Sequence, residues 1–282
     1  MRNFQKNKLV APFVKWAGGK RQLIPDIVSL LPKNLNQYTH VEPFIGGGSV
    51  LFHLQPKSAI INDFNEELIN VYSVIKSHPE ELIEDLKKHK NEADYFYAIR
   101  GLDRTEEFSD LSLIERASRI IYLNKTCFNG LYRVNNAGEF NAPFGRYKNP
   151  NIVNEPVIRA VSDYLNTGQI QILSGDYQEA LKNIQKNAFV YLDPPYHPIS
   201  KSSSFTGYVK GGFNTDDQTK LREVCDELNK KGIKFLLSNS ASEFILEQYQ
   251  QYDINLVKAR RSINSKAIKR GSVDEVLIRN YE

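Results

Sequence analysis

The stretch NAFVYLDPPYHP, residues 187–198, joins a buried strand to a stiff turn that carries polar groups. The apolar run from Phe189 to Leu192 is typical of an interior strand. Two prolines follow, and proline neither continues a strand ladder nor leaves its backbone torsion free. We therefore expect Asp193 and Tyr196 to be held rigidly at the carboxyl end of a strand, where open α/β sheets bind their ligands.

Similar strand-like runs recur along the chain and alternate with helical patterns. They cover residues 39–42, 59–62, 169–173, 233–237, 254–257 and 275–279. Alternation of this kind predicts βαβ units and a largely parallel sheet, and hence an α/β fold. The helix before residue 233 is expected to start at a capping box formed by Thr215 and Gln218, and to stop at Gly232.

The alternation is interrupted after residue 65, and helical patterns dominate the next stretch. One helix is expected to begin at Pro79, and another at the capping box of Ser112 and Glu115. The stretch closes with turn-forming asparagines and glycines, and residues 135–138 indicate a hairpin. The expected division is an α/β domain built from residues 1–65 and 154–282, with residues 66–153 inserted as a second domain.

The composition is that of an ordinary globular protein, with 41% hydrophobic and 25% charged residues among 282. No apolar run approaches the roughly 18 residues needed to span a bilayer, and the start does not resemble a signal peptide. Two cysteines do not form the disulfide set of a secreted chain, and no metal-ligand spacing is present. We expect a cytoplasmic protein without a metal ion.

A glycine turn in VEPFIGGGSVLF, residues 41–52, separates a predicted strand from a helix. Gly46 and Gly48 match the first half of a dinucleotide-binding fingerprint, although Leu51 replaces its third glycine. Asp63 ends the next strand, where an acid is placed to accept the two hydroxyls of a ribose. Together these features predict a ligand that contains a nucleoside.

Two other features bear on the ligand. KWAGGKRQL, residues 15–23, resembles the end of a phosphate-binding loop, but Val14 and Arg21 stand where that loop needs glycine and a hydroxyl, which argues against a nucleotide triphosphatase. Residues 258–270 hold six basic residues and no acid. That run fits a solvated loop as well as a surface that contacts phosphates.

The turn DPPY, residues 193–196, offers a carboxylate and a fixed backbone carbonyl beside an aromatic ring. Two acceptors next to a stacking surface suit the exocyclic amino group of a flat base, because its nitrogen lone pair can then attack an electrophile. The alternative is a proline turn without chemistry. The predicted ribose-binding acid upstream favours the chemical interpretation.

DPPY together with EPFIGGGSV, residues 42–50, resembles the amino-methyltransferases that use S-adenosyl-L-methionine. More narrowly, the chain is similar to the Dam family of DNA adenine-N6 methyltransferases. That resemblance rests on PFVKWAGGKRQL (12–23), INDFNEELIN (61–70), FNGLYRVNNAGEFNAPFGRYK (128–148) and SGDY (174–177). It covers nearly the whole chain and implies a Rossmann-like methyltransferase fold with a mostly parallel mixed sheet. The insert would be a mainly helical target-recognition domain with a β-hairpin.

The resemblance implies roles for individual residues. Asp193 and Pro194 would accept the hydrogens of the target amino group, and Tyr196 would stack on the flipped base. The residues implied in cofactor binding are Trp16, Lys20, Glu42, Phe44, Gly46, Gly48, Asp63, Asp176, Tyr177 and Asp193.

The insert would handle the DNA. An adenine inside a duplex must be rotated out before it can be methylated. By the resemblance, Phe128 and Asn129 would fill the gap, and Leu131, Arg133 and Pro143 would read the bases, arginine being a preferred reader of guanine. Further DNA contacts are expected from Arg146, Lys266 and Arg270, and residues 200–213 would form a loop that closes over the flipped base. Without the resemblance, the same asparagines and aromatics are ordinary turn and packing residues.

We therefore interpret the sequence as a DNA adenine-N6 methyltransferase, bacterial or phage-encoded. It is expected to act as a monomer on GATC in double-stranded DNA, by direct transfer and without a covalent enzyme intermediate. A companion restriction endonuclease is a further expected partner. Two alternatives stay open: a methyltransferase acting on RNA adenine or protein glutamine, and a DNA-binding module that has lost catalysis.

Overall fold

The computed structural model describes residues 6–199, 212–260 and 272–282. Within them a seven-stranded sheet has the order β3-β2-β1-β4-β5-β7-β6, and β7 alone is antiparallel to both of its neighbours. The expected mostly parallel mixed sheet is thus confirmed. The strands are β1 (Thr39–Glu42), β2 (Ser58–Asp63), β3 (Gln169–Ser174), β4 (Ala188–Leu192), β5 (Lys234–Ser240), β6 (Asp253–Arg260) and β7 (Ser272–Arg279).

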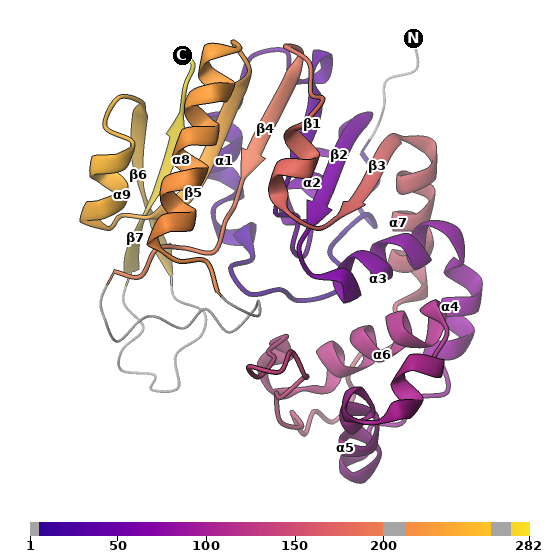
Figure 1. Cartoon of the computed structure of the whole chain (residues 1–282). Helices are drawn as coiled ribbons and strands as arrows, with labels where there is room; N and C mark the ends of the chain where they lie inside the picture. The colour runs from indigo at the N-terminus through magenta and orange to yellow at the C-terminus, as the bar shows by residue number, and fades with distance from the viewer. Residues whose placement is uncertain (1–5, 200–211, 261–271) are drawn as a thin grey trace.

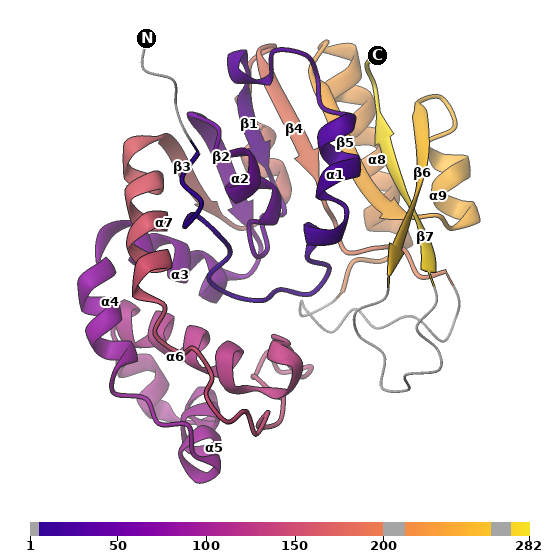
Figure 2. The same ribbon diagram turned by 180° about the vertical axis from the view of Figure 1, so that it is seen from behind.

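Helices cover both faces of this sheet, and β4 shows how the sequence directs them. Its residues alternate, so that Val190 and Leu192 pack towards the side chains of α8 and α9, while Phe189 and Tyr191 pack towards α1 and α2. Figure 1 shows α8 and α9 in front of the sheet, and Figure 2 shows α1 and α2 on the other side. The helices are α1 (Ile24–Ser29), α2 (Ser49–Leu54), α3 (Glu66–Ser77), α4 (Pro79–Leu86), α5 (Ala93–Gly101), α6 (Leu113–Thr126), α7 (Glu155–Thr167), α8 (Thr215–Lys230) and α9 (Glu243–Gln248).

The helical stretch forms a lobe beyond the carboxyl ends of the parallel strands, as both views show. The expected capping box of Ser112 and Glu115 starts α6, and Pro79 is the first residue of α4. The expected hairpin is present, because Val134 and Phe140 form an antiparallel bridge and Asn135 accepts the turn amides. One continuous core runs from the sheet into this lobe, so α3 packs on β3 as well as on α6.

The start of α8 differs from expectation. Asn214, and not Thr215, is the N-cap, and its partner in the capping box is Asp217. An asparagine caps a helix at least as well as a threonine, so the capping box lies one residue closer to the amino terminus than expected. The stop at Gly232 is confirmed, since Gly232 follows the helix with φ of 68°. No helix among the described residues is long and apolar enough to cross a membrane.

Candidate active site

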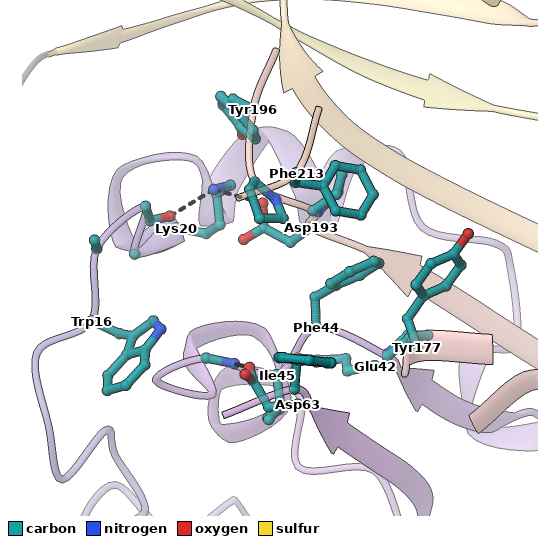
Figure 3. A pocket seen from close by; sticks show the side chains of 18 of the residues that line it. Trp16, Lys20, Glu42, Phe44, Ile45, Asp63, Tyr177, Asp193, Tyr196 and Phe213 are labelled. Atoms are coloured by element: carbon teal, nitrogen blue, oxygen red, sulfur yellow. Dashed lines mark hydrogen bonds and ion pairs between the residues drawn. The ribbon is translucent and has the colours of Figure 1, made fainter. Parts of the chain in front are cut away.

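A cavity of about 570 Å³ opens at the carboxyl ends of the parallel strands. Glu42, Asp63 and Asp193 lie at or just after the ends of β1, β2 and β4, and all three line it. The order of the strands reverses at β1 and β4, which is the point where open α/β sheets leave a crevice for a ligand. Figure 3 shows the side chains that converge there.

The glycine turn after β1 is braced by the acid that ends β2. Gly46 has φ of 49° and donates its amide hydrogen to Oδ2 of Asp63 at 2.9 Å, while Asn65 donates to Oδ1 at 3.0 Å. Tyr72 donates its hydroxyl hydrogen to the Gly46 carbonyl at 2.9 Å. Burial raises the pKa of Asp63. The turn and the acid thus form one unit, which presents a partly buried carboxylate to the cavity.

Gly48 is separate from that unit. It has φ of 69° and caps α2, and a Cβ atom built there would lie 2.6 Å from the Tyr72 hydroxyl and 2.7 Å from a ring carbon of Phe52. Gly48 is absent from the residues that line the cavity. Backbone conformation and packing therefore require a glycine at position 48. The other nine residues implied in cofactor binding all line the cavity.

Trp16 and a pair of aromatic rings stand at different sides of the cavity (Figure 3). Trp16 stacks on Tyr132 of the inserted lobe, with centroids 4.6 Å apart, and its ring also packs against the Gly46 turn. Phe44 stacks on Tyr177 at 5.1 Å, and the edge of Phe213 meets Phe44 at 6.0 Å. The aromatic group formed by Phe44, Tyr177 and Phe213 offers a flat apolar surface of the kind that holds a heteroaromatic ring.

Asp193 lies at the corner formed by the two prolines. Its Oδ1 atom lies 2.8 Å from the Lys20 ammonium nitrogen and accepts a hydrogen bond from Ser238 at 3.0 Å. Lys20 also sits 4.5 Å from the centre of the Tyr196 ring. Burial raises the pKa of Asp193, and the Lys20 ammonium opposes that shift. A cation therefore accompanies a carboxylate that is only 20% exposed, and it favours the charged form of that carboxylate.

The turn after Asp193 is fixed by hydrogen bonds from neighbouring elements. Gln218 of α8 donates to the Pro195 carbonyl at 2.8 Å, and Asn239 of β5 accepts the His197 amide hydrogen at 3.0 Å. The Tyr196 hydroxyl lies 2.6 Å from Ser238 Oγ and 2.8 Å from Oε2 of Glu275. The prediction of a rigid corner is thus supported by contacts from three other elements.

The cavity is strongly acidic. Among the described residues that line it are six carboxylates and one lysine, Lys20. The six are Glu42, Asp63, Asp176, Asp193, Asp217 and Glu275. Glu42 is 2% exposed, and burial raises its pKa while a 2.6 Å hydrogen bond to His40 opposes the rise. Such an excess of negative charge favours a ligand that carries positive charge.

The inserted lobe presents several of the predicted DNA contacts at its surface. Phe128 is 57% exposed, and its amide hydrogen bonds to the Pro143 carbonyl at 2.8 Å. Asn129 and Arg146 have positive φ of 61° and 53°. Arg133 donates to Oδ1 and to the carbonyl of Asn141 at 2.6 and 3.0 Å, across the hairpin from it. Leu131 is partly exposed beside them. Lys266, Arg270 and residues 200–211 of the expected closing loop lie outside the described residues.

Sequence reasoning missed part of the site. Ser238 and Glu275 reach it from β5 and from β7, while Phe213, the last residue of the expected closing loop, lines the cavity from the segment before α8. Glu275 arrives because β7 runs antiparallel, so that its first residues lie at the edge where the parallel strands end. Asp217 lines the cavity, and Gln218 donates a hydrogen bond to the Pro195 carbonyl. Both follow the N-cap of α8, and their position next to the predicted closing loop could have indicated a place in the site.

Comparisons with known proteins agree with this geometry. The family model of the D12 class N6 adenine-specific DNA methyltransferases matches residues 16–263. The Type II methyltransferase M1.LlaDCHI of Lactococcus lactis subsp. cremoris is 46% identical over 100% of this chain and 99% of its own length. The Type II methyltransferase M.MjaIII of Methanocaldococcus jannaschii is 43% identical over 96% of this chain and 99% of its own. The DNA adenine methylase of Escherichia coli K12 is 35% identical over 94% and 93%.

Proposed function

The chain belongs to the D12 class of N6 adenine-specific DNA methyltransferases, and from that premise we propose that it methylates adenine in GATC sites of duplex DNA. The methyl donor is S-adenosyl-L-methionine. The observation that carries the proposal is the corner at Asp193, a carboxylate paired with Lys20 beside the ring of Tyr196 in an acidic cavity. The GATC site rests on the likeness of residues 128–148 to the Dam family.

The cavity fits the proposed methyl donor. That molecule carries a sulfonium, an α-ammonium and an α-carboxylate group, and so a net positive charge, and carboxylates outnumber the one lysine among the described residues that line the cavity. Asp63 would accept its ribose hydroxyls, and Phe44 and Tyr177 would hold its adenine. Glu42 would face its methionine part. When bound, the donor supplies a methyl group on positively charged sulfur, which is electrophilic and leaves a neutral thioether.

Asp193 performs the central task of the proposed mechanism. Its carboxylate accepts a hydrogen bond from the target amino group, together with the Pro194 carbonyl, and this turns the nitrogen lone pair towards the methyl carbon. The ring of Tyr196 stacks on one face of the base. The Lys20 ammonium now covers one face of the Tyr196 ring, and a base that stacked on that face would displace it.

The inserted lobe, residues 66–153, is the proposed target-recognition domain. Phe128 is exposed at its surface and would enter the space that the flipped adenine leaves. Arg133 would read a guanine after exchanging its bonds to Asn141 for bonds to the base. Arg146, Lys266 and Arg270 would contact phosphates. Two relatives are Type II methyltransferases by name, which supports a companion restriction endonuclease.

Methylation of a random-sequence duplex pool, followed by mapping of the modified adenines, tests the proposal. RNA and protein substrates are offered in parallel with a labelled methyl donor. We expect label in DNA alone, at the adenine of GATC. Asp193→Ala should bind the cofactor and transfer no methyl group. Methylation centred on another sequence would overturn the GATC assignment, and full activity of Asp193→Ala would overturn the role of the corner.

A further inference from the structure

A chain of hydrogen bonds leads from Asp193 to a second carboxylate that the proposed mechanism does not use. Ser238 Oγ lies 3.0 Å from Oδ1 of Asp193 and 2.6 Å from the Tyr196 hydroxyl. The Tyr196 hydroxyl in turn lies 2.8 Å from Oε2 of Glu275. The path therefore crosses from the turn after β4, through β5, to β7, and it ends on a side chain that lines the cavity.

The number of hydrogens along this path is informative. Three oxygen–oxygen contacts of 3.0, 2.6 and 2.8 Å need three hydrogens, but the two hydroxyl groups of Ser238 and Tyr196 supply only two. If both terminal carboxylates were ionised, one close oxygen–oxygen contact would lack a hydrogen. One protonated carboxyl group supplies the third. It can sit at either end, because all the hydroxyls can reverse together.

The surrounding charges decide which end holds the proton at rest. Lys20 pairs directly with Asp193 at 2.8 Å and favours its ionised form. Glu275 faces Tyr196 and lies within the field of Lys20 and Asp193, and burial raises its pKa. Its partners across the sheet, Ser240 and Val257, carry no charge. The shared proton therefore belongs on Glu275 before the base is bound.

We propose that Glu275 is the outlet of a proton relay that carries the hydrogen released by the target amino group away from Asp193. The proposal rests on the role of Asp193 in the proposed function. Glu275 touches neither base nor cofactor in this scheme, so it is a positioning residue that acts through Tyr196 and Ser238. Its partly exposed side chain gives the relay contact with water.

The steps balance as follows. N6 of the adenine forms a bond to the methyl carbon, and the carbon–sulfur bond breaks with its electron pair left on sulfur. The resulting cationic amine gives one proton to Asp193, and Glu275 releases its own proton to water. Asp193 then passes its proton to Ser238, Ser238 passes its own to Tyr196, and Tyr196 passes its own to Glu275. One proton has moved from N6 to water, and the starting state is restored.

Multiple-turnover methyl transfer to a GATC duplex by the full-length protein tests the relay, because the relay restores ionised Asp193 only after the methyl group has been transferred. Glu275→Gln keeps a hydrogen-bonding partner for Tyr196 but cannot exchange a proton. We expect its rate to fall by about 10- to 100-fold, with cofactor affinity unchanged. Ser238→Ala should slow the step similarly, and the double variant should be no slower than the slower single variant, because both break one path. The matched control is Glu247→Gln, which replaces an exposed carboxylate on α9.

A second measurement distinguishes a loss of proton transfer in the Glu275 variants from a change in the geometry of Tyr196 alone. In Glu275→Ala, added formate should restore a large part of the rate, whereas chloride at the same ionic strength should not. A Glu275→Gln rate within about twofold of wild type, multiplicative effects in the double variant, or no rescue by formate would each overturn the relay. If the wild-type protein itself leaves every DNA adenine unmodified, the proposed function fails instead, and the two failures are distinguishable.

Discussion

Lys20 and Asp193 form an ion pair of 2.8 Å in which the lysine is 6% exposed and the aspartate 20%. A buried carboxylate without a cation would tend to take up a proton, and a protonated Asp193 would be a poor acceptor for an amino group. The lysine comes from the segment before α1, far from Asp193 in sequence. The pair therefore couples the amino-terminal segment to the charge state of Asp193 in the proposed catalytic corner.

The first prediction concerns this pair. In Lys20→Met the opposing ammonium is lost, so the pKa of Asp193, already raised by burial, should rise further. Because the proposed mechanism needs the ionised form, the acidic limb of the single-turnover rate against pH should move to higher pH. Lys20→Arg keeps the charge and should move the limb less. An acidic limb at the same pH in Lys20→Met would contradict this role.

The second prediction concerns Asp63, whose two oxygens accept the amide hydrogens of Gly46 and Asn65. In Asp63→Asn one of these oxygens becomes an amino group that faces a donor. We expect the dissociation constant for S-adenosyl-L-methionine to rise by about 10- to 100-fold, equivalent to about 1 to 3 kcal/mol. Trp16, the single tryptophan of the chain, lines the cavity and reports binding by its fluorescence. Asp163→Asn, at an exposed site on α7, should bind as wild type does.

The third prediction concerns Phe128, exposed on the inserted lobe. Phe128→Ala removes the ring proposed to fill the vacated base position, so the flipped state should lose a few kcal/mol. With 2-aminopurine at the target position, we expect a much smaller fluorescence increase on binding than for wild type. Tyr97→Ala removes another exposed ring from the same lobe and should leave the signal intact. An unchanged signal in Phe128→Ala would remove that residue from base flipping.

The parts of the site nearest a motif could be predicted from the sequence. Asp63 ends β2 and Asp193 directly follows β4, and the parallel direction of these strands brings their carboxyl ends to one edge of the sheet. The relay residues could not be predicted. Ser238 and Glu275 lie in strands whose apolar pattern looks ordinary, and only the antiparallel return of β7 beside β5 brings Glu275 to the site. The spacing of residues along the sequence does not indicate which strands pair with each other.

Two local features show why other expectations shifted. Gly48 lies in the glycine turn and looks like part of a ligand site, yet its left-handed backbone and contact with Tyr72 explain it without a ligand. Asn214 and Thr215 are both good capping residues, so the sequence left the start of α8 undecided by one position. The side chain of Asn214 accepts hydrogen bonds from the amides of Asp216 and Asp217, which settles the boundary.

The fourth prediction concerns Gly48. Gly48→Ala adds a Cβ atom at 2.6 Å from the Tyr72 hydroxyl, on a residue with positive φ. The free energy of unfolding should fall by about 2 to 4 kcal/mol. Gly101→Ala is the matched control, because Gly101 ends α5 with nothing within 4 Å of the added atom. It should be neutral or stabilising by up to about 1 kcal/mol. Equal unfolding free energies for the two variants in denaturant would contradict the packing argument.

The fifth prediction concerns acid stability and His89 in the inserted lobe. Its Nδ1 lies 2.9 Å from the Tyr95 hydroxyl and its Nε2 3.0 Å from Ser118 Oγ, and the ring stacks on Tyr122 at 4.3 Å. Burial lowers the pKa of His89 from 6.5 to about 4. The unfolded chain therefore takes up a proton at this site before the folded protein does.

Stability from this group is complete above the unfolded pKa and is lost as the pH falls from about 6.5 to about 4, because in that window only the unfolded state is protonated. The loss should reach about 1 to 3 kcal/mol, allowing for partial exposure. His89→Gln should unfold more easily at pH 7 but lose less stability on acidification. His78→Gln removes an exposed histidine and should retain the wild-type slope of unfolding free energy against pH. A wild-type slope in His89→Gln would show that the acid sensitivity of the lobe arises from other groups.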